Sequence, residues 1–166
     1  MTAIEFAAVS TPFFALLFAI LETALALWTT QVLETGVTNA SRRIYTGQFQ
    51  SDNTGTDPAA LPGKFRDEIC KSIPALISCS KIQIDVRLYT SVPGQKPQIP
   101  ITSGGQFDAA NFGKYEPPGA NQIVVVRAAV ELPVYVSLLN PHQANLTNGN
   151  RLIMGTAAFR TEPFAN

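Results

Sequence analysis

The chain has 166 residues with 12 basic and 12 acidic side chains, so its formal charge is zero, and only 14% of its residues are charged. A typical soluble domain is about 25% charged. This composition excludes a disordered tail, a collagen and a nucleic-acid-binding surface, and we expect no nucleic-acid partner. The length fits one domain, or one small domain with an attached segment.

Charge and apolar residues are unevenly distributed along the chain. Residues 1–41 contain three acidic residues and no basic one, whereas every basic residue lies from Arg42 onward. The apolar residues are concentrated at the start. This asymmetry predicts two units, an N-terminal transmembrane helix over residues 1–47 and an α+β domain over residues 48–166; the family resemblance described below implies that the helix is pilin-like.

Residues 6–33 form a long apolar run. Of these 28 residues, 20 are hydrophobic, and the only charged residue is Glu22. A helix that spans a bilayer needs about 20 mostly apolar residues. A cleaved signal peptide is the alternative, but its apolar core is usually about 7–15 residues long and follows a basic start. No basic residue precedes this run, and the pattern therefore favours a retained transmembrane helix.

The polar residues of this run can be placed along the helix. Glu5 and Glu22 are separated by about 26 Å of helix, and the hydrocarbon core is about 30 Å thick. We expect the two carboxylates near opposite interfaces, with Trp28 as an interfacial aromatic residue. Pro12 removes one helical hydrogen bond, and it predicts a bend at that turn.

The helical pattern continues beyond the apolar run. Apolar residues recur at three- and four-residue intervals from Val32 to Ile44, which predicts an amphipathic helix as far as Tyr45. Gly47 is the expected stop, because glycine readily adopts the left-handed conformation that ends helices. The amphipathic end needs a partner, and the domain that follows is the simplest one.

The remaining residues predict a small α+β domain, with one short helix and about three antiparallel strands. Alternating apolar residues indicate a half-buried strand, and clusters of proline and glycine indicate loops. Pro133 marks a bend or a sheet edge, and Gly155 weakens the last strand. In chain order we expect a loop at 48–60, a helix at 62–73, a strand at 81–89, mainly loop at 91–121, a strand at 122–132, an extended or helical segment at 134–139 and a strand at 151–160.

Cys70 and Cys79 are the only cysteines and lie nine residues apart, with Pro74 reversing the chain between them. Beyond a membrane anchor this spacing favours a disulfide, whereas in a cytosolic domain two buried free thiols would be the alternative. A metal site would need more ligands than these cysteines and the lone His142, so we expect no metal.

No motif in the sequence indicates a catalytic function. No serine lies in a nucleophile-elbow motif and no glycine-rich loop has the pattern of a phosphate site. The adjacent carboxylates Asp67 and Glu68 point to different faces of a helix. We expect no enzyme, no catalytic residue and no cofactor. A membrane-bound enzyme would need a pocket, for which the 91–121 loop is the only obvious place.

Glu5 has two interpretations. A carboxylate in the first turn of a helix complements the helix dipole, and this local role alone would explain it. However, the segments TAIEFAAVSTPFFALLFAILET, FRDEIC, LISCSKIQIDVRLY, NQIVVVRAAVELPVYVSLL and ANLTNGNRLIMGTAAFRTEPF together resemble the TadE-like family. These proteins are pseudopilins, or minor pilins, of the tight-adherence (Flp-type) pili of bacteria. The resemblance implies a subunit-assembly role for Glu5 and Phe6, in which the carboxylate meets the free amino terminus of a neighbouring subunit.

The resemblance also implies partners and a location. The partners would be other pilin or pseudopilin subunits, the pilus assembly machinery and the lipid of the bacterial inner membrane. The family's basic leader, cut by a prepilin peptidase after a glycine, does not precede Met1 in this sequence, and the peptidase is a partner if a leader is present. The expected protein is a single-pass membrane protein with a periplasmic C-terminal domain, which can also become part of the pilus outside the cell. The alternative is a membrane-tethered periplasmic binding or adhesin module.

Overall fold

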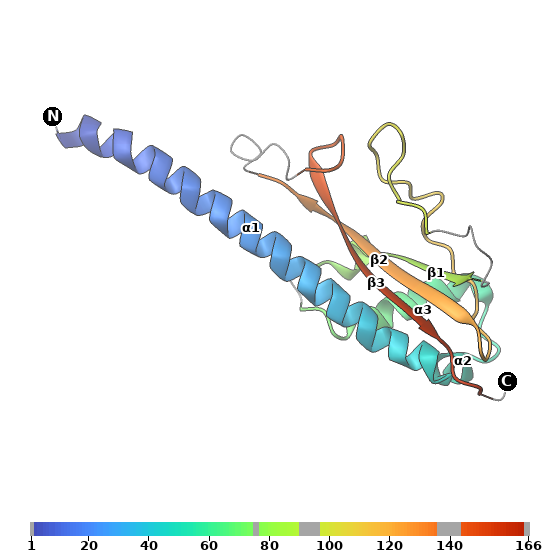
Figure 1. The fold of residues 1–166 in the computed structure, drawn as a ribbon. Helices are drawn as coiled ribbons and strands as arrows, with labels where there is room; N and C mark the ends of the chain where they lie inside the picture. Colours follow the sequence, from blue (N-terminus) through green and yellow to red (C-terminus); the bar gives the residue numbers. More distant parts are fainter. Residues whose placement is uncertain (1, 75–76, 90–96, 136–143, 165–166) are drawn as a thin grey trace.

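The computed structural model describes residues 2–74, 77–89, 97–135 and 144–164, and one long helix dominates it (Figure 1). The predicted α+β fold, with a long N-terminal helix, a short helix and a three-stranded antiparallel sheet, is confirmed. The helices are α1 (Thr2–Tyr45), α2 (Gln48–Asp52) and α3 (Leu61–Cys70), and the strands are β1 (Gln83–Tyr89), β2 (Ile123–Pro133) and β3 (Asn150–Arg160). Short 3-10 turns occupy Pro58–Ala60 and Cys79–Lys81.

Helix α1 ends at the predicted glycine. Gly47 has a φ of 78°, and its N–H donates to the carbonyl of Ile44 at 3.1 Å. The ring of Phe164 covers this turn so closely that a Cβ on Gly47 would lie 2.6 Å from it. At the other end the backbone remains helical through Pro12, and the bend there stays a prediction.

The prediction of a loop at 48–60 is wrong, because α2 and a 3-10 turn occupy most of it. Phe49 is the reason: only 2% of its surface is exposed. Its ring lies 5.4 Å from that of Phe65 on α3 and 6.1 Å from that of Tyr115, between centroids. Burial of the Phe49 ring therefore stabilises a short helix in a stretch whose polar residues predict a loop. Further along, α3 ends at Cys70 rather than at 73, and residues 136–139 of the predicted 134–139 segment lie outside the described residues.

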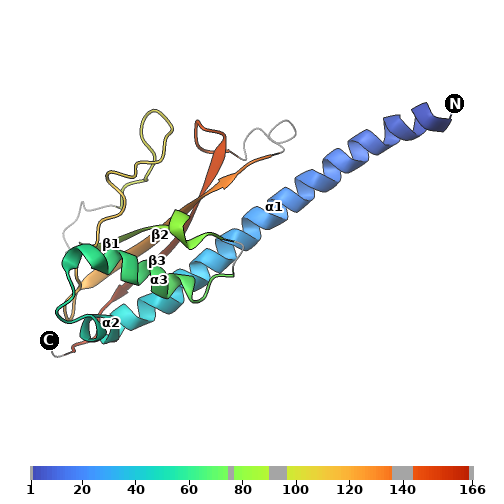
Figure 2. The ribbon, with the colours of Figure 1, turned by 180° about the vertical axis from the view of Figure 1, so that it is seen from behind.

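The sheet is an antiparallel meander in the order β1-β2-β3. One face packs on α3 and on the C-terminal half of α1 (Figure 2). Val86 pairs with Val126, and Val126 pairs with Ala157, so equivalent apolar positions face the helices in all three strands. On α1 this core contains Leu33 and Val37, neither of which is exposed. The amphipathic end of α1 therefore packs against the sheet of the domain that follows it, as the sequence pattern predicted.

The second face of the sheet carries a buried ion network. The strand pattern placed Asp85 on the polar face of β1, yet none of its surface is exposed and Arg127 on β2 is only 5% exposed. The Nε of Arg127 donates to Asp85 Oδ2 at 3.1 Å, and the Nε of Arg87 donates to Asp85 Oδ1 at 3.0 Å. The polar face is covered rather than solvated, which the alternation alone does not reveal.

The covering layer is the part of the predicted loop that follows residue 96, and the same network attaches it to the sheet. Arg127 Nη1 donates to the carbonyl of Gln98 at 2.6 Å, and the backbone N–H of Lys114 donates to Asp85 at 3.3 Å. The Arg127 guanidinium also lies 5.0 Å from the ring centroid of Phe112. One buried carboxylate therefore organises a segment that has little regular structure of its own.

Gly155 is the point where β3 and α1 come closest. A Cβ at this position would lie 3.1 Å from the backbone N of Glu34 and from the backbone C and O of Leu33. The sequence pattern predicted that this glycine would weaken the strand. In the structure it instead allows the helix and the strand to approach at backbone distance.

Replacing Gly155 by alanine should destabilise the protein. The added methyl group meets helix backbone, which cannot rotate away, and overpacking of this kind costs about 1–3 kcal/mol. The loss would appear in thermal unfolding in detergent micelles, at about 2–4 °C per kcal/mol. Gly63→Ala is the matched control: it lies in α3 with nothing within 4 Å of an added Cβ, and should stabilise slightly. Equal melting temperatures for Gly155→Ala and the wild type would contradict the close contact.

Asp85→Asn should cost about 3–5 kcal/mol, because it leaves the charge of Arg127 buried without its counter-ion. Urea unfolding followed by circular dichroism would measure it. The double variant Asp85→Leu/Arg127→Met removes both buried charges and should recover much of the loss. A single variant as stable as the wild type would show that Asp85 is not the centre of the network.

Candidate functional site

The N-terminal half of α1 exposes an unusual amount of apolar surface. Monomeric soluble proteins rarely expose contiguous apolar patches above a few hundred Å². No residue in the most apolar stretch of 18 residues in α1 is buried. The mean hydropathy of this stretch is 2.0. The helix is therefore long and apolar enough to span a membrane. Among the described residues, its exposed large hydrophobic side chains are Ile4, Phe6, Val9, Phe13, Phe14, Leu16, Phe18, Ile20, Leu21, Leu25, Leu27 and Trp28.

The folded domain meets α1 at a definite level. Ala26 is the first buried side chain along the described part of the helix, at 3% exposure. One turn earlier, Glu22 accepts a hydrogen bond from the backbone N–H of Tyr135, just beyond the end of β2. Residues 3–21, the free segment, lie before these contacts and are about 28 Å long. This length matches the hydrocarbon core of a bilayer, which is about 30 Å thick.

Hydroxyl groups in the free segment are satisfied inside the helix itself. Thr11 donates to the carbonyl of Ala7 at 2.8 Å, and Ser10 donates to the same carbonyl at 3.3 Å. A serine or threonine that bonds back to the preceding turn has no unmet donor. These residues are thus compatible with a lipid environment.

The predicted assembly residues all lie in the free segment. Glu5 is exposed in the first turn of α1, and Phe6 is 72% exposed. Pro12 is exposed two turns later. Within one chain these side chains point outward, so the structure does not bring them together with the domain. Their roles in assembly and bending remain predictions that need a neighbouring molecule or a membrane.

Sequence reasoning missed the contact between Glu22 and Tyr135. The only signal was that Glu22 is the single charge in the apolar run. Its partner is 113 residues away in sequence and donates a backbone group, so no side-chain pattern marks it.

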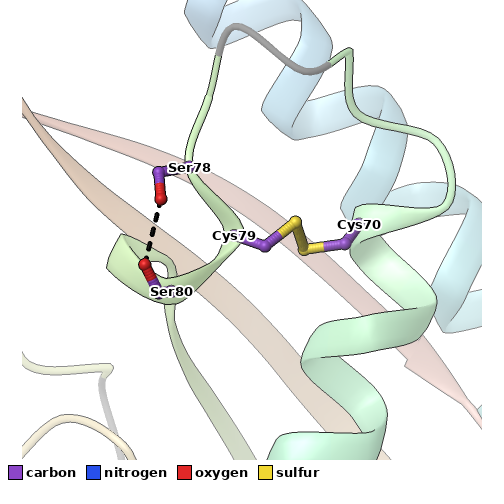
Figure 3. Close-up of a disulfide and its surroundings, with 4 residues drawn as sticks. All are labelled: Cys70, Ser78, Cys79 and Ser80. Carbon is purple, nitrogen blue, oxygen red and sulfur yellow. Dashed lines mark hydrogen bonds between the residues drawn. A yellow bond between two sulfur atoms is a disulfide. The ribbon is translucent and has the colours of Figure 1, made fainter.

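The predicted disulfide is present, and it closes the connection between α3 and β1 (Figure 3). Cys70 is the last residue of α3, and Cys79 begins the 3-10 turn before β1. Their Cα atoms are 6.0 Å apart. The alternative of two free thiols is wrong, since both cysteines are bonded. Disulfides persist mainly in oxidising compartments such as the bacterial periplasm.

Ion pairs join the three helices near the end of α1. Arg43 contacts Asp52 of α2 and Glu68 of α3, and Lys71 also contacts Glu68 at 2.7 Å. Burial alone would raise the pKa of Glu68, but hydrogen bonds from Lys71 and Arg43 outweigh it and lower the pKa. The ion pairs of Glu68 with Arg43 and Lys71 therefore stabilise the folded state at pH values above the ordinary pKa of glutamate. This stabilisation is lost as the pH falls through the lowered pKa of Glu68.

A groove of about 550 Å³ lies beside the segment where an enzyme pocket was sought. Phe107 and Ala109 line it from that segment, and Lys81 and Glu131 are its charged residues. The Glu131 carboxylate already accepts hydrogen bonds from the amides of Asn148 and Asn150, each at 2.9 Å. Within the described ranges no three His, Cys, Asp or Glu side chains are placed to hold a metal. His142 lies outside the described residues.

The structure thus defines a class, namely an α+β domain built onto a helix that can span a membrane. Residues 1–42 match the family model described as TadE-like protein. This match confirms the predicted family likeness over the helix, while the likeness of the later segments remains a prediction. Comparison with curated proteins and with solved structures gave no match.

The variant Cys70→Ser/Cys79→Ser should be less stable than the oxidised wild type by about 2–3 kcal/mol, because the short closed loop no longer restricts the unfolded chain. Thermal melts in micelles would measure the difference. The oxidised wild type is the reference, and wild-type protein treated with a reducing agent is the control. The reduced protein should have the same melting temperature as the variant. No change in either sample would mean that the bridge adds nothing to stability.

Proposed function

We propose that this chain is a membrane-anchored pseudopilin, or minor pilin, that takes part in the assembly of a tight-adherence pilus. The single observation that carries the proposal is the division of α1. Its free segment is apolar and unburied, while its other half forms the core of the domain. The family match over residues 1–42 supports the same conclusion. In this proposal residues 1–47 are the anchoring unit, and residues 48–166 are the exported domain.

The free segment would first hold the protein in the inner membrane and then pack against the helices of other pilin subunits. Both environments cover the same apolar side chains, so a subunit can pass from one to the other without exposing them to water. Glu5 is the exception, since an unpaired carboxylate is costly in such surroundings. The amino terminus of a neighbouring subunit would supply the opposite charge, with Phe6 packing beside it.

One observation favours a periplasmic domain. Disulfides persist mainly in oxidising compartments, and the domain beyond the free segment carries the Cys70–Cys79 bridge. The partners would be other pilin subunits, the assembly machinery and membrane lipid, and the role would be structural rather than enzymatic. The second candidate, a tethered binding or adhesin module, uses α1 only as an anchor.

Glu5→Ala separates the two candidates. A strain lacking the gene would receive the full-length gene with its natural start, as wild type or variant, and pili would be counted by electron microscopy. Under the pilin proposal the variant should lose pili while its membrane level, measured by immunoblot, stays normal.

Glu34→Ala is the matched control, because Glu34 is also an exposed glutamate of α1 but lies beyond the free segment. It should leave piliation unchanged. Normal piliation with Glu5→Ala would reject the pairing role and favour the anchored module.

A further inference from the structure

The end of β2 lies beside α1 at the level where the free segment ends. In Figures 1 and 2, β2 runs along α1 and its Pro133 end points toward the exposed half of the helix. The hydrogen bond from the Tyr135 N–H to Glu22 fixes this arrangement. When the free segment spans the hydrocarbon core, as the proposed function requires, Glu22 lies at the boundary of that core. The end of β2 then lies at the same boundary.

The side chain at this level is suited to a membrane surface. Tyr135 is 83% exposed, which makes it the most exposed of the large hydrophobic side chains in the described part of the chain. Tyrosine and tryptophan are enriched where bilayers meet water, because their rings are apolar and their polar atoms remain hydrated. An almost fully exposed ring at the end of a strand has no packing role inside the domain.

A second aromatic residue lies close to the same level on the helix. Trp28 is 40% exposed and follows Glu22 by about 9 Å along α1. The headgroup region on one side of a bilayer is about 5–8 Å thick, so this distance places Trp28 at its outer edge. The helix and the sheet therefore each present one aromatic side chain to the same layer.

We propose that Tyr135 lies in the headgroup region of the bilayer and forms, together with Trp28, a lipid contact that holds the sheet against the membrane surface. This inference rests on the proposed insertion of α1. The occupant of the surface is lipid rather than protein, because the hydrogen bond to Glu22 places Tyr135 next to the segment that lipid covers in the proposed function. The hydrogen bond from the Tyr135 N–H also suits this location, because it gives the Glu22 carboxylate a polar partner at the boundary between headgroups and hydrocarbon.

The chain offers a direct test, because Trp28 is its only tryptophan. The variant Trp28→Phe/Tyr135→Trp carries one fluorophore at the end of β2. The protein would be reconstituted into vesicles of phosphatidylcholine and phosphatidylglycerol, with some lipids brominated either near the headgroup or near the middle of the acyl chain. Bromine quenches tryptophan on contact. We expect a blue-shifted emission, loss of most fluorescence with headgroup-proximal bromine, and a smaller loss with mid-chain bromine.

Two controls keep the outcomes distinct. Trp28→Phe/Tyr45→Trp places the fluorophore about 35 Å beyond Glu22 along α1, and it should be quenched by aqueous acrylamide but not by either lipid. Trp28→Phe/Phe13→Trp places it in the free segment, where mid-chain bromine should quench it most strongly.

Each result has a definite meaning. If the Phe13→Trp fluorophore is not quenched by lipid, α1 is not inserted, and both this inference and the anchoring proposal fall. If it is quenched while the Tyr135→Trp fluorophore responds only to acrylamide, the anchoring proposal stands and the second contact is wrong. If the Tyr135→Trp fluorophore is protected from acrylamide and from both lipids, another protein chain covers it, and the lipid contact is again rejected.

Discussion

The packing of the C-terminal half of α1 against the sheet is the interaction on which the rest of the structure depends. Leu33 and Val37 are fully buried in the same core as Val86 and Val126. The backbone contact at Gly155 holds the helix at short range along β3. The helix that provides this core continues without a break into the free segment. The segment that is apolar enough to span a membrane and the core of the domain therefore belong to one secondary-structure element.

The second face of the sheet follows a different physical rule. It combines a buried carboxylate and two arginines with a second, smaller apolar cluster of Phe112, Ala129, Leu146 and Leu152. The ionic contacts add directional geometry to this apolar packing. The segment after residue 96 is accordingly tied to the sheet by hydrogen bonds to its backbone carbonyl and amide groups. The domain therefore has one side with a large apolar core, which receives the helix, and a second side with an ion network and a smaller apolar cluster, which receives a long loop.

Local patterns predicted much of this fold. The apolar run and its amphipathic continuation predicted α1, Gly47 predicted its end, and alternation predicted the first strand. The cysteine spacing, with Pro74 between the two residues, predicted the bridge for a domain that lies beyond a membrane anchor. The features that sequence reasoning missed are non-local: Phe49 finds rings on α3 and beyond β1, Asp85 is covered by a distant loop, and Glu22 meets a backbone group of a residue 113 positions away. No periodicity within one element encodes such partners.

The continuity of α1 has a mechanical consequence. Thr2–Tyr45 would extend for about 66 Å as a straight helix, and Pro12, where a kink is easiest, lies inside the free segment. A pull or a twist applied to the amino-terminal end is therefore transmitted along the helix into the folded domain. Because β3 contacts the helix over several turns, an axial pull loads this interface in shear, which requires many contacts to break at once. A force on the free segment would therefore move the helix and the domain together as one body.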